Sequence, residues 1–300
     1  KFEPILKEKI WGGEKLMKVL SKKSNKTDIG ESWEISDVPG ATSIVSNGHL
    51  KGTDLKQLIV DYKSDLVGAK TYQVFGENFP LLIKFIDAKE ALSIQLHPND
   101  ELAQKRHNSF GKTEMWYVVD ADKNANLIVG FKKEVTSDEY LKNLKNNTLL
   151  DILNVDTVVE GDVYFIPTGR VHAIGAGVLL AEIQQTSDIT YRIYDWDRKD
   201  AEGNYRDLHT EEALNAIDYH VQDSYKTTYQ KKENTASKVV SCPYFTTNIL
   251  PVKNSVSVNH TDKDSFVIYM CVKGSVTFKY NEVEEVLYFG ETLLVPACIK

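Results

Sequence analysis

The sequence predicts a mainly β fold made of two jelly-roll domains with a small helical insertion. First, short apolar runs rich in Val, Ile, Tyr and Phe recur along the 300 residues, separated by Gly, Asn, Asp and Pro. Such runs are typical of antiparallel strands. Second, apolar residues with helical spacing are confined to a few segments. Third, one motif occurs twice, which indicates two related halves.

The strand-like runs begin at Ser32 and continue to the end of the chain. Each is a short apolar stretch, or an alternation of apolar and polar residues, that stops at a turn-forming residue. The runs are SWEISDV, TSIVSNG, PLLIKFIDA, LSIQLH, EMWYVV, ANLIVGF, VYFIPT, VLLAEIQQ, ITYRIYDW, SFVIYMCV, SVTFKY and TLLVPA.

Three segments have the spacing of amphipathic helices, at 53–68, 136–154 and 207–218. The second opens with Thr and Ser, which commonly cap helices, and it is long enough for one helix or two. Between 219 and 239 the chain turns polar and loses its periodicity, which predicts a linker or an edge segment. We therefore expect a first domain with helical segments at 1–230 and a second jelly-roll domain at 231–300.

The repeated motif is a Gly and an acidic residue, followed by apolar residues, a Pro and a small residue. It reads GDVYFIPT at 161–168 and GETLLVPA at 290–297. In a β barrel this pattern describes a turn, a strand and a Pro that ends the strand at the rim. Chance recurrence of a common turn is the alternative. The second copy lacks a QxH-like segment, so we expect no metal site in the second domain.

Composition and charge argue against several classes of protein. The 36 basic and 43 acidic residues give a net charge of −7, which argues against general nucleic-acid binding. No apolar run approaches the length of a membrane span. Cys242, Cys271 and Cys298 form no CxxC pair and favour a reducing compartment. We expect a cytoplasmic protein without nucleic-acid or membrane partners; no segment indicates an oligomeric state.

The stretch SIQLHPND, at 93–100, places polar side chains at alternate positions. Alternation along a strand brings Ser93, Gln95 and His97 to one face. That face either meets water or lines a site that uses an imidazole nitrogen and an amide oxygen.

Two further stretches contain the other candidate ligands. In GKTEMWYVV, alternation groups Lys112, Glu114 and Trp116 on one face, and GRVHAIGAG presents His172 just beyond the Pro167 strand end. Two imidazoles, a carboxylate and an amide oxygen suit zinc, and in the absence of thiolates they also suit other divalent ions. A solvated strand carboxylate at position 114 is the alternative.

The stretch AEIQQTSDITYRIYDWDR, at 181–198, carries Glu182, Asp188, Arg192 and Arg198 among aromatic residues. Charges in apolar surroundings are costly unless they are paired or used. Arg192 could bind an anion through two hydrogen bonds or stabilise an oxyanion. A structural ion pair with a nearby aspartate is the alternative.

In this order, SIQLHPND, GKTEMWYVV, GRVHAIGAG and TSDITYRIYDWDR resemble segments of type I mannose-6-phosphate isomerase (phosphomannose isomerase), particularly its short bacterial form. The segments KEKIWGGEKL and GESWEISDVPGATSIVSNG are also similar to that family, so the likeness runs from about residue 7 to about residue 200. The resemblance implies a cupin-type jelly roll and a zinc-dependent aldose–ketose isomerase. Such an enzyme interconverts mannose 6-phosphate and fructose 6-phosphate through a cis-enediol.

The resemblance also implies one zinc ion per chain and a role for individual residues. The metal ligands would be Gln95, His97, Glu114 and His172. Arg192 matches the family's catalytic arginine in its S-D-x-x-x-R pattern, and Lys112 matches a lysine two residues before the Glu ligand. The long enzymes of the family have a larger helical insertion and differ after the arginine, where this chain reads YDWDR.

The isomerisation must polarise a carbonyl, stabilise an oxyanion and move a proton. Candidates for the proton carrier are Asp188, Glu182, Lys112 and a metal-bound water. The candidate cations for the substrate phosphate are Lys112, Arg170, Arg192 and Arg198, and Ser93 could add a hydroxyl. An iron-dependent cupin oxygenase and a non-catalytic sugar-phosphate-binding protein are the alternatives. The amide ligand and the cations favour a sugar-phosphate substrate.

Overall fold

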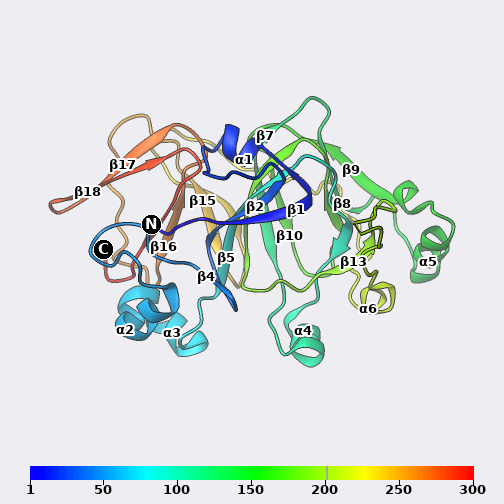
Figure 1. Cartoon of the computed structure of the whole chain (residues 1–300), viewed down its shortest axis with the longest axis horizontal. Helices are drawn as coiled ribbons and strands as arrows, with labels where there is room; N and C mark the ends of the chain where they lie inside the picture. The colour runs from blue at the N-terminus through cyan, green and yellow to red at the C-terminus, as the bar shows by residue number, and fades with distance from the viewer. Residues whose placement is uncertain (201) are drawn as a thin grey trace.

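The computed structural model describes residues 1–200 and 202–300, and two antiparallel sheets form its centre (Figure 1). The prediction of a mainly β fold is confirmed. The division into two jelly-roll domains stays a prediction. Both copies of the repeated motif form a strand that ends directly before its proline, Pro167 or Pro296.

The larger sheet has the strand order β1-β2-β5-β12-β7-β10. Its strands are β1 (Ile5–Gly13), β2 (Ile29–Ile35), β5 (Leu81–Ala88), β7 (Glu114–Ala121), β10 (Val163–Ile166) and β12 (Val178–Gln185). Every residue of β2 and β5 is buried. Charged side chains within these strands therefore need partners inside the protein.

The smaller sheet has the order β13-β6-β11-β8-β9. Its strands are β6 (Ile94–Leu96), β8 (Asn126–Phe131), β9 (Leu153–Thr157), β11 (His172–Ile174) and β13 (Tyr191–Tyr194). The register pairs Arg192 with Gln95 on the next strand, and Gln95 with His172 on the strand after that. Directly opposed residues point to the same face of a sheet. These three side chains therefore form a row.

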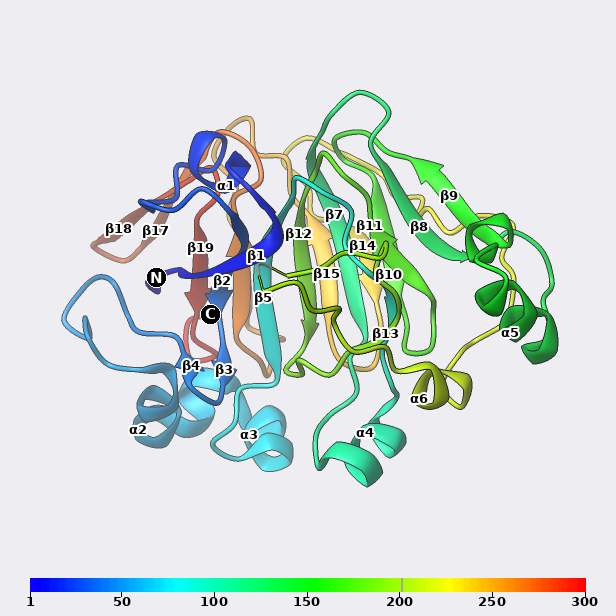
Figure 2. The same cartoon turned by 45° about the vertical axis from the view of Figure 1, so that its right-hand side comes forward.

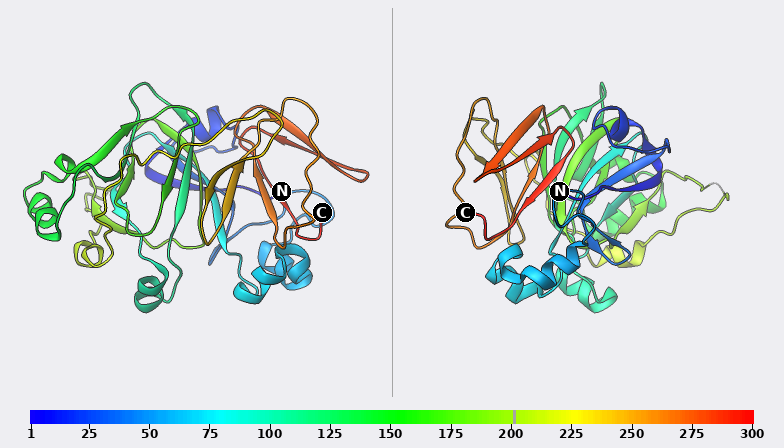
Figure 3. Two further views of the ribbon diagram at one scale, coloured as in Figure 1. Left: turned by 180° about the vertical axis from the view of Figure 1, so that it is seen from behind. Right: turned by 60° about the vertical axis from the view of Figure 1, so that its left-hand side comes forward.

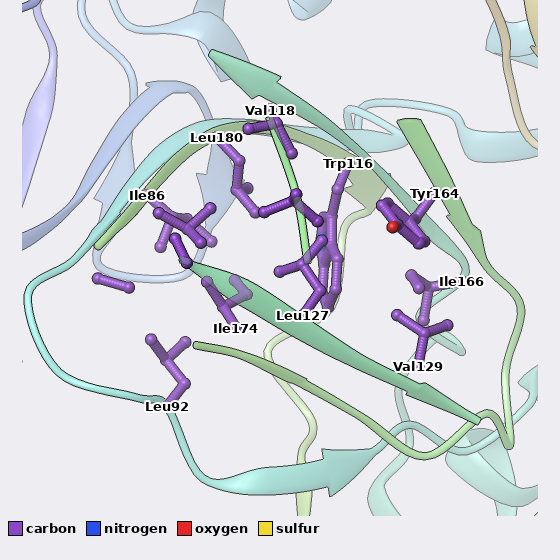
Figure 4. Packing of buried hydrophobic residues seen from close by; sticks show 14 of the residues in the cluster. Ile86, Leu92, Trp116, Val118, Leu127, Val129, Tyr164, Ile166, Ile174 and Leu180 are labelled. Carbon is purple, nitrogen blue, oxygen red and sulfur yellow. The ribbon is translucent and has the colours of Figure 1, made fainter. Parts of the chain in front are cut away.

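Apolar side chains from both sheets meet in one cluster (Figure 4). Trp116 and Leu180 come from the larger sheet, and Leu127 and Ile174 come from the smaller one. The cluster holds the two sheets face to face. The strand ends that carry polar residues are therefore held in place by this apolar cluster, and the cluster contains none of those polar residues.

The C-terminal strands lie against the outer face of the larger sheet (Figure 3). They pair as β14 (Ser237–Ser241) with β15 (Thr246–Ile249), β16 (Val267–Met270) with β19 (Thr292–Val295), and β17 (Ser275–Tyr280) with β18 (Val283–Tyr288). A further short pair is β3 (Asp37–Val38) with β4 (Ala41–Thr42). Phe245 and Leu294 share an apolar cluster with Ile83 and Val163.

The helices α2, α3 and α4 lie along one edge of the sheets (Figure 2). The helices are α1 (Lys15–Lys18), α2 (Leu55–Val67), α3 (Ala69–Phe75), α4 (Asp100–His107), α5 (Ser137–Lys145) and α6 (Thr210–Leu214), with a 3-10 turn, η1, at Leu149–Asp151. The prediction at 53–68 agrees closely with α2. In the 136–154 segment, α5 ends before Asn147, whose φ of 57° is left-handed, and the last residues join β9.

The predicted helix at 207–218 is wrong in length, because only Thr210–Leu214 is helical. Residues before it are held along β13 instead: the His209 N–H donates to the Arg192 carbonyl at 2.7 Å. Among the described residues, no helix has the combination of length and apolar character that crossing a membrane requires.

Candidate active site

Three side chains that can bind a metal meet between the two sheets. His97 follows the last residue of β6, whereas Glu114 and His172 begin β7 and β11. All three are buried, and their candidate ligand atoms lie within 4.8 Å of one another. Glu114 Oε2 is 3.6 Å from His97 Nε2, and Glu114 Oε1 is 3.5 Å from His172 Nε2. The structure therefore brings together three of the four predicted ligands.

Backbone carbonyls orient both imidazoles. His97 Nδ1 lies 2.8 Å from the carbonyl oxygen of Ile189, and His172 Nδ1 lies 2.8 Å from that of Arg170. A carbonyl oxygen only accepts hydrogen bonds, so each Nδ1 carries the proton and each Nε2 keeps its lone pair. Burial lowers the pKa of both side chains, to about 4 for His172. Both histidines are thus neutral, and each turns the lone pair of its Nε2 toward Glu114.

Gln95, the fourth predicted ligand, lies beside His172. Its amide nitrogen is 3.4 Å from His172 Nε2, and the Ser93 hydroxyl donates to its Oε1 over 3.3 Å. Rotating the amide by 180° exchanges its nitrogen and oxygen, and the Ser93 hydroxyl can accept as well as donate. Gln95 can therefore turn its oxygen toward the histidine nitrogens.

The Glu114 carboxylate is the clearest sign that these residues fit a cation. Within the described part of the chain, neither of its buried oxygens accepts a hydrogen bond, although the Lys112 ammonium lies 3.3 Å from Oε2. Burial and the nearby charge of Glu182 raise the pKa of Glu114 above its ordinary range. A buried carboxylate without hydrogen bonds is costly. A divalent ion bound by Glu114, the two Nε2 atoms and the Gln95 oxygen would remove that cost.

A cleft of about 150 Å³ opens beside this cluster, and Ser93, Gln95, His172 and Asp188 line it. The basic residues that line it are Lys9, Lys84, Lys112, Arg192 and Arg206. These five basic residues outnumber the three acidic residues of the lining, Glu31, Glu182 and Asp188, although the whole chain carries a net charge of −7. A cleft lined in this way favours an anionic ligand.

Lys112 is the cation nearest the histidines. Its Nζ lies 3.2 Å from His97 Nε2 and 3.3 Å from Glu114 Oε2. Glu182 is already engaged, because Lys84 Nζ is 2.9 Å from its Oε1 and the Trp116 indole donates to its Oε2 at 2.8 Å.

Lys84 is a cleft residue that the sequence analysis missed. It interrupts the apolar run LLIKFIDA, and the rule that a buried charge must be paired or used would have identified it. Burial alone would lower the pKa of Lys84, but the charges of Glu182 and Glu31 outweigh it and raise the pKa above its usual value. Lys84 therefore stays protonated.

Arg192 and Asp188 lie at the edge of the cleft. The Arg192 Nη1 donates to the carbonyl of Asp207 at 2.9 Å, and among the described residues no partner meets its buried Nε. Asp188 is exposed and lines the cleft. Arg206 was also missed by the sequence analysis. It is held by Asp195, whose Oδ2 accepts from its Nε at 2.7 Å.

A family model for the phosphomannose isomerase type I catalytic domain matches residues 1–143. The mannose-6-phosphate isomerase ManA of Bacillus subtilis is 34% identical over 299 residues, which cover 98% of this chain and 92% of that protein. The chain belongs to the type I phosphomannose isomerase family. The mannose-6-phosphate isomerase of Streptococcus mutans is 35% identical and covers 98% of this chain and 90% of its own length.

Solved structures of phosphomannose isomerases have the same fold. The crystal structure of mannose 6-phosphate isomerase from Bacillus subtilis superposes with a TM-score of 0.87 at 32% identity, covering 99% of this chain and 93% of that one. The apo enzyme from Salmonella typhimurium is only 16% identical, yet its TM-score is 0.78 over 99% of this chain and 94% of that one. The latter comparison supports the fold alone.

In this member of the phosphomannose isomerase family, two of the arginines suggested for phosphate binding lie outside the cleft lining. Arg170 is 5% exposed; its Nη1 donates to the Phe165 carbonyl, and its guanidinium lies 5.1 Å from the ring centre of Tyr225. Arg198 is paired with Asp195 at 2.7 Å.

Proposed function

We propose that the protein is a zinc-dependent aldose–ketose isomerase that interconverts mannose 6-phosphate and fructose 6-phosphate. The observation that carries the proposal is the buried Glu114 carboxylate between two neutral imidazoles, at the end of a basic cleft. Membership of the phosphomannose isomerase family supports the same reaction.

The ligands of the zinc ion would be Gln95, His97, Glu114 and His172. Bound there, one zinc ion per chain would supply Lewis-acid polarisation of the sugar carbonyl. The imidazoles need no proton loss to bind it, because each carries its proton on Nδ1 and keeps the lone pair on Nε2.

The cations of the cleft would bind and orient the sugar phosphate. We propose that Ser93, Lys112 and Arg192 contact the substrate. Arg192 is suited to bind an anion because, among the described residues, its buried Nε–H has no partner and can still donate a hydrogen bond. Lys84 would contribute a fixed positive charge that favours an oxyanion developing in the cleft.

The isomerisation moves a proton between C1 and C2 through a cis-enediol, and a side chain must carry that proton. Asp188, Glu182 and Lys112 are the candidates. Both oxygens of Glu182 are engaged by Lys84 and Trp116. Asp188 is exposed and lines the cleft. These contacts favour Asp188 over Glu182.

Removal and restoration of the metal tests the proposal. We expect the protein to form fructose 6-phosphate from mannose 6-phosphate, to lose this activity on chelation, and to regain it with one equivalent of zinc. The circular dichroism spectrum should stay unchanged throughout, because the apolar core supports the ligand strands.

Full zinc loading with an intact fold and no turnover of mannose 6-phosphate would refute the isomerase proposal. Turnover that survives complete removal of divalent ions would refute its metal dependence.

We further propose that the protein acts in the cytoplasm, where a sugar phosphate is available and the free thiols of Cys242, Cys271 and Cys298 stay reduced.

A further inference from the structure

The segment 111–113 carries Lys112 between α4 and β7, before the strand begins. Glu114 is held by the ladder of the larger sheet, where it pairs with Ile166 on β10 and Gln184 on β12. Lys112 precedes this ladder, yet its Nζ lies between His97 and Glu114. Other contacts must therefore fix the peptide from which Lys112 extends.

Two side chains hold the peptide groups on either side of Lys112. Asp100 Oδ1 accepts the N–H of Gly111 at 2.8 Å, and Gln185 Oε1 accepts the N–H of Thr113 at 2.8 Å. The backbone N–H of Gln185 also donates to the Thr113 carbonyl at 3.1 Å. The two acceptors are joined, because Gln185 Nε2 donates to Asp100 Oδ1 at 3.0 Å.

Steric contact fixes the same segment from another side. A Cβ added to Gly111 would lie 2.7 Å from the backbone nitrogen of Asp100, which is closer than real Cβ atoms approach. The segment 111–113 therefore packs directly on the first turn of α4. Only glycine allows this close approach. The distance of the segment 111–113 from α4 is therefore fixed, as are the hydrogen bonds of the segment.

The C-terminal part of the chain contributes a third contact. Tyr244, between β14 and β15, donates its hydroxyl proton to Asp100 Oδ2 at 2.5 Å. Burial would raise the pKa of Asp100, but the hydrogen bonds from Tyr244, Gly111 and Gln185 outweigh it and lower the pKa. Asp100 thus remains an ionised acceptor for all three donors.

We propose that Asp100 and Gln185 are positioning residues of the isomerase, and that Tyr244 extends their hydrogen-bond network to the C-terminal part of the chain. The network fixes the segment 111–113 and thereby positions the Lys112 side chain beside the ligand candidates His97 and Glu114. This inference rests on the proposed function, because it takes Lys112 to contact the substrate. It assigns the turn between β14 and β15 a role in the site, although the residues that line the cleft all precede residue 207.

Kinetics of two variants at one position give the first test. Asp100→Ala removes the acceptor for Gly111 and Gln185, whereas Asp100→Asn keeps an oxygen that can accept from both. We expect kcat of the zinc-loaded protein to fall by about tenfold to a hundredfold in Asp100→Ala, since a displacement of about 1 Å has effects of this size. Asp100→Asn should recover most of that loss. The matched control is Glu101→Ala, which removes the neighbouring exposed acidic residue of α4 and should leave kcat unchanged.

Hydrogen exchange gives the second test, and it does not depend on activity. In Asp100→Ala and Gln185→Ala, the amides of Gly111 and Thr113 should exchange faster than in the wild type, whereas amides within β7 should be unchanged. Tyr244→Phe removes only the hydroxyl of an exposed side chain, so it should fold even if the other variants do not. It should accelerate the same amides by a smaller factor.

Faster exchange at 111–113 with a wild-type kcat would overturn the positioning role. Unchanged exchange in Asp100→Ala and Tyr244→Phe would overturn the network itself, whatever the kinetics. A wild-type protein that binds zinc but does not isomerise mannose 6-phosphate would reject the proposed function instead. The exchange rates would still decide whether Asp100 and Gln185 hold the segment.

Discussion

At the scale of single residues, the cleft is a set of buried charges that stabilise one another. Glu31 shows this clearly: Lys9 Nζ is 3.3 Å from its Oε1, and the Trp33 indole donates to its Oε2. Burial alone would raise the pKa of Glu31, but the charges of Lys84 and Lys9 outweigh it and lower the pKa to about 2. Removing one member of the set leaves its partners as unpaired buried charges.

The pKa of Glu31 predicts how the protein responds to acid. A depressed carboxyl pKa stabilises the fold above the unfolded-state value near 4.5, and this contribution is lost as the pH falls toward about 2. Between pH 5 and pH 3 the loss is about 2 kcal/mol for a shift of this size. In Glu31→Gln, the free energy of unfolding should therefore decrease less across this interval, as measured by urea denaturation.

Glu8→Gln is the control, because Glu8 is an exposed carboxylate on β1. The free energy of unfolding of Glu8→Gln should change with pH in parallel with that of the wild type. If Glu31→Gln also runs parallel to the wild type from pH 5 to pH 3, the charges of Lys84 and Lys9 do not stabilise the ionised carboxylate.

At the scale of elements, apolar periodicity decides which helices the sequence reveals. The segment at 53–68 alternates apolar and polar faces and forms α2, with the Asp54 side chain accepting from the N–H of Gln57. Helix α4 was missed because it buries only Ala103 and so has no apolar stripe. Its signals are local ones: Asn99 caps its N-terminus, and Asn108 ends it in a left-handed conformation.

The cap of α5 gives a prediction at this scale. The Thr136 side chain accepts from the N–H of Glu139. Thr136→Ala leaves that N–H without its partner and should lower the free energy of unfolding by about 1 kcal/mol, measured by urea denaturation. Catalysis should be unaffected, since α5 carries no residue of the cleft. Restored stability in Thr136→Ser would tie the loss to the cap; an equal loss in Thr136→Ser would contradict this explanation.

The strand runs and the faces that polar side chains share could be predicted from the sequence because both depend on a period of two, whereas the full set of ligand candidates came from the resemblance to the family. Alternation groups Ser93 with Gln95, and Lys112 with Trp116, on the faces that line the cleft. The register between strands is not visible in one sequence, so the row of Arg192, Gln95 and His172 could not be predicted by spacing. Arg206 was missed for the same reason, because its position depends on an ion pair with Asp195 that a single sequence does not reveal.

At the scale of the whole molecule, the two predicted domains share apolar surface. Val240, Phe245 and Leu294 belong to a cluster with Ile83 and Val163 of the larger sheet. Each such side chain contributes about 1.5–3 kcal/mol when fully buried, whereas a protein's total stability is about 5–15 kcal/mol. The outer face of the larger sheet thus depends on the C-terminal strands for its burial.

We therefore predict that a chain ending at residue 230 will not fold on its own. It should aggregate or lack a cooperative thermal transition, as measured by gel filtration and circular dichroism. Adding the 231–300 segment as a separate chain should restore part of the transition. A monomeric 1–230 chain with cooperative melting would instead show that the first domain is independent.

The tryptophans of the chain gather around the cleft. Three of the four, Trp11, Trp33 and Trp116, line it, and the indole of Trp196 donates to the carbonyl of Leu92 at its edge. The ring centre of Trp116 also lies 5.3 Å from that of His172. The tryptophan fluorescence of this protein therefore originates around the cleft. Tryptophan emission can follow metal or ligand entry without any label, whereas events at α5, which carries no tryptophan, should leave it unchanged.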